Sequence, residues 1–162
     1  MPKYFAYGSN MNTASMALRA PRSKMIGTAK LMRHTFVVTE GGYASVVRHP
    51  GGVVYGVLWD LALSDIGALD RYEGASYSKI TQPVIKTAGG AANALLYVSA
   101  LSPGGRATAD YAAEVSEAAA GLQFPHGYLT LLHMSLGLAA PKRLEIDRPK
   151  VRVRFASPLD RG

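Results

Sequence analysis

The chain has 162 residues, of which 48% are hydrophobic and 18% charged, a composition typical of one globular domain with a buried core. No apolar run approaches the roughly twenty residues that a membrane-spanning helix needs, and the first residues lack a signal-peptide pattern, so we expect a cytoplasmic protein. The absence of cysteine excludes disulfides, thiolate nucleophiles and iron–sulfur clusters.

The N-terminal stretch KYFAYGSNMN is aromatic and apolar at first and then changes to small polar residues. Residues 3–7 predict a short strand, because aromatic side chains suit a pleated, half-buried surface. Residues 13–19 predict a helix, which either Asn12 or Thr13 can cap.

The loop between this strand and this helix consists of Gly8, Ser9 and Asn10. Gly8 predicts a backbone conformation that a side chain would forbid, and the two polar residues can bond nearby backbone groups. Such a loop leaves backbone N–H groups free to hold an anion or a developing oxyanion.

The middle of the chain predicts strands that are separated by paired glycines. Gly41-Gly42 and Gly89-Gly90 are expected to form turns, and Pro83 marks a bulge or a sheet edge. The stretch 51–61 is apolar enough to be buried on both faces. The predicted strands cover residues 24–38, 43–49, 51–61, 77–87 and 92–99.

Three further helices are expected. One covers 65–72 with Ser64 as its N-cap and Gly74 after its end, and the others begin at Thr108 and Pro125. The elements do not alternate regularly, which favours an α+β fold, a small curled sheet or mixed barrel flanked by helices. We expect one domain over 1–141 and a basic extension over 142–162.

Two carboxylates share the apolar face of the helix predicted around residues 64–74. Asp70 and Glu73 follow Ile66 and Leu69 at helical spacing. The ordinary explanation is a frayed helix end whose carboxylates turn to solvent. If Glu73 is instead partly buried, desolvation and the like charge of Asp70 both raise its pKa, as a general base near neutral pH requires.

Other chemistries find little support. Ser9 lacks the first glycine of the Gly-x-Ser-x-Gly nucleophile motif, and the chain has no phosphate-binding Gly-x-x-x-x-Gly-Lys motif. We therefore expect no metal and no cofactor. Metal-ligand spacing is absent from the four histidines, which are His34, His49, His126 and His133.

The net charge of +7 is concentrated near the C-terminus, where residues 142–154 carry six basic and two acidic side chains. A nucleic-acid patch is one interpretation. The stretch VRVRF, residues 151–155, alternates like a strand with one solvated face, and no aromatic platform accompanies the charge. The pattern therefore favours a terminal strand over nucleic-acid binding.

The segments YFAYGSNM, GGVVYGVLWDL and LDRYEG, with YAAEVSEAAAGLQFPHGYLTLL after them, resemble the gamma-glutamylcyclotransferase-like family in order and spacing. The resemblance covers roughly residues 3–138. It implies a small mixed barrel with flanking helices and a small gamma-glutamyl substrate over the barrel mouth, with no cofactor and no membrane.

The resemblance also implies roles for individual residues. Glu73 would be the acid–base residue, and the loop Tyr7, Gly8, Ser9 and Asn10 would cradle the gamma-glutamyl group. Two further tyrosines would line the pocket, Tyr77 and Tyr128.

In the implied reaction the substrate's alpha-amine attacks its own gamma-amide carbonyl, giving 5-oxoproline and a free amine or amino acid. Two alternatives remain open at this point. One is a non-catalytic protein of the same fold that binds a small ligand or an acidic partner. The other is a relative that acts on gamma-glutamyl-amine metabolites. Neither the leaving group nor the oligomeric state follows from the sequence.

Overall fold

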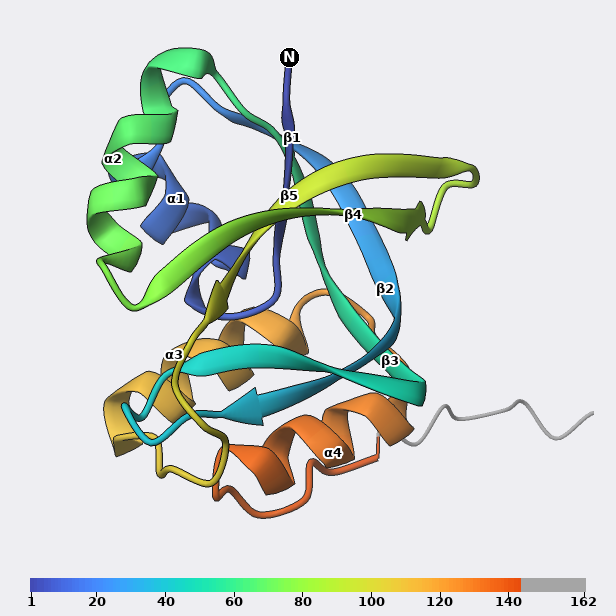
Figure 1. The fold of residues 1–162 in the computed structure, drawn as a ribbon. Helices are drawn as coiled ribbons and strands as arrows, with labels where there is room; N and C mark the ends of the chain where they lie inside the picture. Colours follow the sequence, from blue (N-terminus) through green and yellow to red (C-terminus); the bar gives the residue numbers. More distant parts are fainter. Residues whose placement is uncertain (144–162) are drawn as a thin grey trace, which may run out of the picture.

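The computed structural model describes residues 1–143, and in this part of the chain five strands close into a barrel (Figure 1). The strand order around the barrel is β1, β3, β2, β4 and β5, and every pairing is antiparallel except the parallel pairing of β1 with β5. The predicted α+β fold with a small mixed barrel is confirmed. The strands are β1 Lys3–Ala6, β2 Lys24–Val38, β3 Ala44–Asp60, β4 Tyr77–Lys86 and β5 Ala91–Ser99.

Four α-helices and one short 3-10 helix accompany the barrel within residues 1–143. Asn12 caps α1, since its Oδ1 accepts a hydrogen bond from the Ser15 N–H at 3.0 Å, and Thr108 caps α3. None of these helices is long and apolar enough to cross a membrane. The helices are η1 Ser9–Met11, α1 Thr13–Arg19, α2 Leu63–Glu73, α3 Ala109–Ala120 and α4 His126–Ser135.

The two strands predicted over 43–49 and 51–61 are in fact one strand, β3. Its partner β2 runs beside it along nearly its whole length, and the pair bends together at a register shift between Met32 and His34. Gly52 lies so close to the His34 carbonyl that an added Cβ would be 2.2 Å from its oxygen. This glycine therefore permits close strand packing and does not end the strand.

Two smaller predictions are settled by the same elements. Ser64 does not cap α2, because the helix begins at Leu63, two residues earlier than predicted, with Ala62 at the cap position and no side-chain bond there. Pro83 lies at an edge and not at a bulge. The β4–β5 register is regular through Pro83, and β4 meets β2 only near its end, at Ile85 and Lys86. The strand predicted over 151–155 lies outside the described residues.

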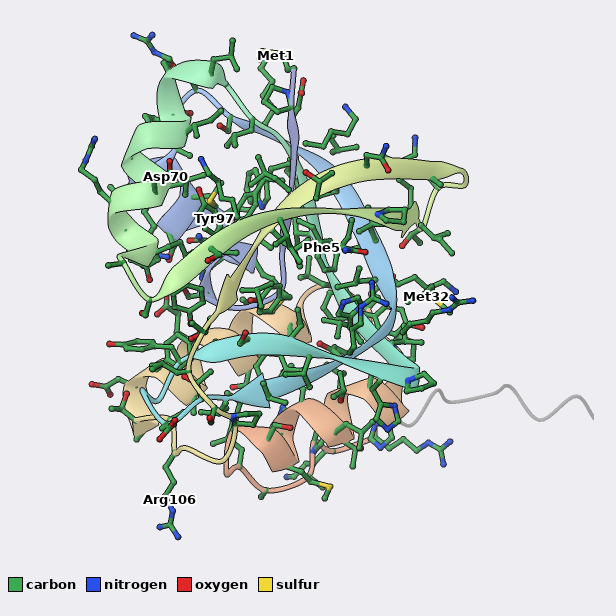
Figure 2. All side chains as sticks on the ribbon, viewed as in Figure 1. Met1, Phe5, Met32, Asp70, Tyr97 and Arg106 are labelled. Atoms are coloured by element: carbon green, nitrogen blue, oxygen red, sulfur yellow. The ribbon has the colours of Figure 1, made fainter. Side chains whose placement is uncertain are left out.

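Apolar side chains from all five strands fill the barrel, with Phe5 near its centre (Figure 2). Figure 1 shows α2 and α1 together on one side of the barrel, and α3 and α4 at its lower end. The 3-10 helix η1 follows β1 directly and contacts both α1 and α3. The segment after β1 is therefore held between helices from distant parts of the chain. The largest fully buried strand side chains are Phe5, Leu31, Val54, Val57, Leu58, Val84 and Leu96.

β1 lies so close to β3 that there is no room for a side chain at Gly56. A Cβ there would lie 2.3 Å from the Ala6 carbonyl oxygen and 2.8 Å from the Phe5 ring. We expect Gly56→Ala to lower the free energy of unfolding by about 1–3 kcal/mol or more, because overpacking displaces β1. Urea denaturation measures the change.

Gly127→Ala is the matched control, since a Cβ at this helical position meets no atom within 4 Å. This variant should be as stable as wild type or more stable by about 0.4–1 kcal/mol. Equal stability of the Gly56→Ala protein and wild type would show that β1 does not depend on this contact.

Candidate active site

A cavity of about 260 Å³ opens beside the loop that follows β1. Its wall comes from this loop, the end of α2, the starts of β3 and β4, and from β5 and α3. The volume is near the lower end for ligand pockets, which suits a small molecule. Seven of the lining residues are tyrosines, and the lining residues are Tyr4, Tyr7, Gly8, Ser9, Asn10, Tyr43, Ala44, Tyr72, Glu73, Ser76, Tyr77, Tyr97 and Tyr111.

Glu73 is the last residue of α2 and the acidic group of the cavity wall. Burial raises its pKa from the ordinary 4.5 to about 7, and the positive charge of Arg19 opposes this rise. The side chain of Asn10 donates a hydrogen bond from Nδ2 to Glu73 Oε1 at 3.3 Å. The predicted rise in pKa is thus present and comes from desolvation.

Asp70 does not raise the pKa of Glu73, so the prediction that its like charge would do so was wrong. Its Oδ2 accepts a hydrogen bond from Lys79 Nζ at 2.8 Å, and its Oδ1 accepts one from the Tyr97 hydroxyl at 2.6 Å (Figure 2). The bond from Lys79, followed by that from Tyr97, holds the Asp70 pKa below its usual value. Asp70 therefore faces β4 and β5 as an ionised group, while Glu73 faces the cavity.

Gly8 has a φ of −116° and a ψ of −135°, and the space around it is limited. The constraint is space, because an added Cβ would lie 3.2 Å from the Tyr111 hydroxyl and 3.4 Å from the Ala44 Cβ. That hydroxyl accepts a hydrogen bond from the Ala44 N–H at 3.1 Å. The loop therefore packs directly on the contact between α3 and the start of β3.

Ser9 and Asn10 are both buried, and their side chains form a network with neighbouring helices. Ser9 Oγ lies 3.2 Å from the Tyr72 hydroxyl, and Asn10 Nδ2 donates to the Tyr4 hydroxyl at 3.0 Å. The backbone N–H groups of both residues have no acceptor among residues 1–143. Their side chains are thus committed to the protein while two backbone donors stay available.

Tyr7 and Tyr77 also line the cavity, as the resemblance implied for residues at these positions. The Tyr77 hydroxyl donates to the Ala44 carbonyl at 2.6 Å, and the Tyr7 hydroxyl donates to the Tyr97 carbonyl. Burial raises the pKa of Tyr77 to about 12 and that of Tyr7 well above its ordinary value. Both tyrosines therefore remain neutral hydroxyls near pH 7.

Tyr128 does not line this cavity, which corrects its predicted place. It lies on α4, where its ring packs on Tyr55 and Phe124 with ring centroids 5.0 and 5.8 Å away. Its hydroxyl donates to the Tyr55 carbonyl at 3.4 Å. Tyr128 is a core residue between α4 and β3.

Several lining residues could not be assigned from the sequence. Tyr111 has helical spacing with Val115, which predicts a core residue, and its hydroxyl nevertheless reaches the cavity. The others carry no motif, and only the closure of the barrel brings them together. The unassigned residues are Tyr4, Tyr43, Ala44, Tyr72, Ser76, Tyr97 and Tyr111.

Neither histidine nor a metal-binding cluster is part of this site. The cavity lining contains no histidine, and residues 1–143 contain no group of three His, Asp or Glu side chains arranged to hold a metal ion. What the cavity offers is a carboxylate that titrates near neutrality, neutral hydroxyls and backbone donors. This set can transfer a proton and stabilise a developing oxyanion.

Sequence comparison finds relatives along most of this fold. The family model described as "Gamma-glutamyl cyclotransferase, AIG2-like" matches residues 4–114. Proteins named gamma-glutamylcyclotransferase from Bos taurus and Homo sapiens are each 35% identical in a match that covers 44% of this chain and 43% of theirs. The match therefore spans less than half the length of these curated relatives.

Structural comparison finds the same architecture. A solved structure named gamma-glutamyl cyclotransferase has a TM-score of 0.75 and 24% identity, over 81% of this chain and 85% of that one. YkqA from Bacillus subtilis has a TM-score of 0.68 and 24% identity, over 88% of this chain and 56% of its own. At this level of identity the likeness shows a shared fold.

The raised pKa of Glu73 predicts how stability depends on pH. Folding favours its protonated form, so its contribution to stability is fully present below about pH 4.5 and is lost as the pH rises through about 7. We expect the thermal midpoint of Glu73→Gln, relative to wild type, to rise between pH 4.5 and 7 and to level off above. Circular dichroism melts from pH 4 to 9 measure this difference.

Asp70→Asn is the matched control on the same helix, and it should behave oppositely. The Asp70 pKa is lowered in the folded state, so the wild-type carboxylate stabilises the fold above its ordinary pKa and loses this effect as the pH falls. The Asn variant should thus be less stable than wild type at pH 7 and should approach it in acid. A pH-independent difference for Glu73→Gln would contradict the assigned burial.

Proposed function

Because the chain belongs to the AIG2-like gamma-glutamyl cyclotransferase family, we propose that it converts a small gamma-glutamyl amide into 5-oxoproline and a free amine or amino acid. One observation carries the proposal. Glu73, with a pKa of about 7, lies in a small cavity beside the loop Tyr7 to Asn10. A carboxylate of this kind is suited to exchange protons with a bound substrate at neutral pH.

The reaction needs no nucleophile from the protein. The substrate's alpha-amine nitrogen forms a bond to its own gamma-carbonyl carbon, and the bond from that carbon to the leaving nitrogen breaks. Holding the substrate folded for this attack can supply about 7–11 kcal/mol of the barrier. A cavity of about 260 Å³ supports this role, because it can confine a glutamyl group.

Glu73 would carry the proton between the two nitrogens. As a carboxylate it accepts a proton from the alpha-amine, and as the acid it returns this proton to the departing nitrogen. One group can do both in sequence when its pKa lies near the working pH. The hydrogen bond from Asn10 Nδ2 supports this assignment, because it directs one carboxylate oxygen and leaves the other free.

The backbone N–H groups of Ser9 and Asn10 would hold the carbonyl oxygen as it gains charge. They are suited to this because no acceptor among residues 1–143 takes these donors. A single donor of this kind is worth about 3–4 kcal/mol in the transition state.

A hydrolase mechanism based on Ser9 has less support. Its hydroxyl is engaged with Tyr72 and Arg19, and no histidine lines the cavity to activate it. A purely binding function has less support as well. A binding site gains nothing from a desolvated carboxylate that is ionised only above about pH 7.

Activity on gamma-glutamyl amines is a second candidate, favoured by the charge of the cavity wall. Among residues 1–143, neither lysine nor arginine lines the cavity, so this part of the chain positions no cation there for the carboxylate of a leaving amino acid. A panel of gamma-glutamyl amino acids and gamma-glutamyl alkylamines, assayed for 5-oxoproline, separates the candidates. Release from neither class, with binding of both, would favour the non-catalytic alternative.

Glu73→Gln tests the central role, because the amide keeps the size of the side chain but cannot accept a proton. We expect kcat/KM for 5-oxoproline release to fall by about 10²–10⁴-fold. The wild-type rate should rise with pH through about 7, as the carboxylate ionises. Steady-state kinetics from pH 5 to 9 measure both effects.

Asp70→Asn is the control for this experiment and should cost less, since Asp70 contacts Lys79 and Tyr97 instead of facing the cavity. An active Glu73→Gln protein together with an inactive Asp70→Asn protein would reverse the assignment. Full activity in both variants would disprove the mechanism.

Gly8→Val tests the loop, because its side chain would push against Tyr111 and Ala44. We expect a folded protein with turnover reduced by about 10²-fold or more, as small displacements of a substrate cradle have large kinetic effects. Circular dichroism checks the fold and the 5-oxoproline assay checks turnover. Wild-type turnover in the folded variant would remove this loop from the site.

A further inference from the structure

Arg19, the last residue of α1, contacts three other parts of the chain, which are η1, α2 and α3. Its Nη1 donates to Asn10 Oδ1 at 2.7 Å and to Ser9 Oγ at 3.2 Å. Its guanidinium lies over the Tyr72 ring, with Cζ 3.7 Å from the ring centroid, and its Nη2 lies 3.8 Å from Glu114 Oε1. With 21% of its side chain exposed, this arginine is held on several sides.

The contact with Arg19 determines which way the Asn10 amide points. A carboxamide has one accepting end and one donating end, whereas a guanidinium only donates. The amide oxygen must therefore face Arg19, and the NH₂ group must face the other way. On that side it donates to Tyr4 at 3.0 Å and to Glu73 at 3.3 Å.

We propose that Arg19 is a positioning residue of this site, which orients the Asn10 amide so that its NH₂ group holds the Glu73 carboxylate in its ionised form. The link to turnover rests on the proposed function. The link to Glu73 ionisation does not, because it follows from the contacts alone. Arg19 acts on Glu73 without lining the cavity.

The positive charge of Arg19 favours the ionised form of Glu73, as the hydrogen bond from Asn10 does. Burial raises the pKa of Glu73, and the Arg19 charge lowers it in opposition. Asp70, on the same helix, is bound to Lys79 and Tyr97 and turns away. The other titratable groups that line the cavity with Glu73 are tyrosines, and Tyr43 and Tyr72 are two of them. Burial raises the pKa of the remaining five, which stay neutral, namely Tyr4, Tyr7, Tyr77, Tyr97 and Tyr111.

The first experiment measures Glu73 directly, by NMR titration of carboxyl-labelled glutamate, with Glu73→Gln identifying its signal. We expect Arg19→Met to move the titration midpoint to higher pH. Arg22→Met, three residues further on at an exposed position, should leave it unchanged. Arg19→Lys keeps the charge but loses the hold on the Asn10 amide, so its midpoint should lie between those of wild type and Arg19→Met.

The second experiment separates charge from geometry by kinetics. A lysine cannot lie flat on Tyr72 and donate to both loop residues, since it lacks the planar fork. We therefore expect both Arg19→Lys and Arg19→Met to lose about 10–100-fold in kcat/KM. The ascending pH limb should move to higher pH in both variants, and further in the Met variant, which also loses the charge. Arg22→Met should match wild type in rate and profile.

A double-mutant cycle tests whether Arg19 acts through Asn10. Once Asn10→Ala has removed the amide, the further loss of Arg19 should cost little, so the two effects on kcat/KM should be clearly less than additive. Thermal melts confirm that each variant is folded. If Arg19→Met does not fold, Arg19→Lys takes its place in the cycle.

The proposal is overturned if the folded Arg19→Met protein keeps the wild-type midpoint, if Arg22→Met shows the same losses, or if the double-mutant effects add. If the wild-type chain releases no 5-oxoproline from any substrate, the proposed function fails. The NMR titration still decides the effect of Arg19 on Glu73 in that case.

Discussion

The double pairing of β1 determines where the loop of Tyr7 to Asn10 lies in the cavity wall. This strand has four residues, Lys3–Ala6, and pairs with β3 on one side and with β5 on the other, so it closes the barrel. The close approach of Gly56 to Ala6 and Phe5 holds it against β3. The chain therefore leaves the barrel at a defined point, and Tyr7 to Asn10 meet β5, α2 and α3 there.

Asp70 and Glu73 show how one helix provides two carboxylates with opposite properties. Asp70 is close to a lysine and a tyrosine hydroxyl, and both donors favour its ionised form. Three residues later the helix ends, and Glu73 lies half-buried beside the loop, where desolvation favours the protonated form. The difference comes from the surroundings, since both groups are carboxylates on neighbouring turns.

Local signals in the sequence were sufficient for most of the fold. Capping residues such as Asn12 and Thr108, and Gly74 after α2, predicted helix ends that the structure confirms. The prediction of two strands over 43–49 and 51–61 was wrong, because these residues form one strand, in which Gly52 makes room for the His34 carbonyl. That contact depends on a neighbouring strand and is not visible in a local window of sequence.

The site could be predicted only in part for the same reason. Glu73 was found because helical periodicity placed a carboxylate on an apolar face. Tyr97 and Tyr111 line the cavity, but their sequence neighbours give no sign of it. Tyr128 was misplaced because the resemblance supplied a residue type without the helix orientation, which turns its ring toward Tyr55.

The cavity wall consists of two parts, and they differ in how freely their residues can change in evolution. Glu73 and the loop after β1 form one part, tied to the barrel through β1 and to α1 through Arg19. Tyr43 and Ser76 come from the connections just before β3 and β4, and 56% of Tyr43 is exposed. Substitutions in these connections can change which molecule fits while Glu73 and its supports stay unaltered. A new shape of the cavity mouth is therefore accessible to this fold through a few surface changes that leave the buried part of the wall intact.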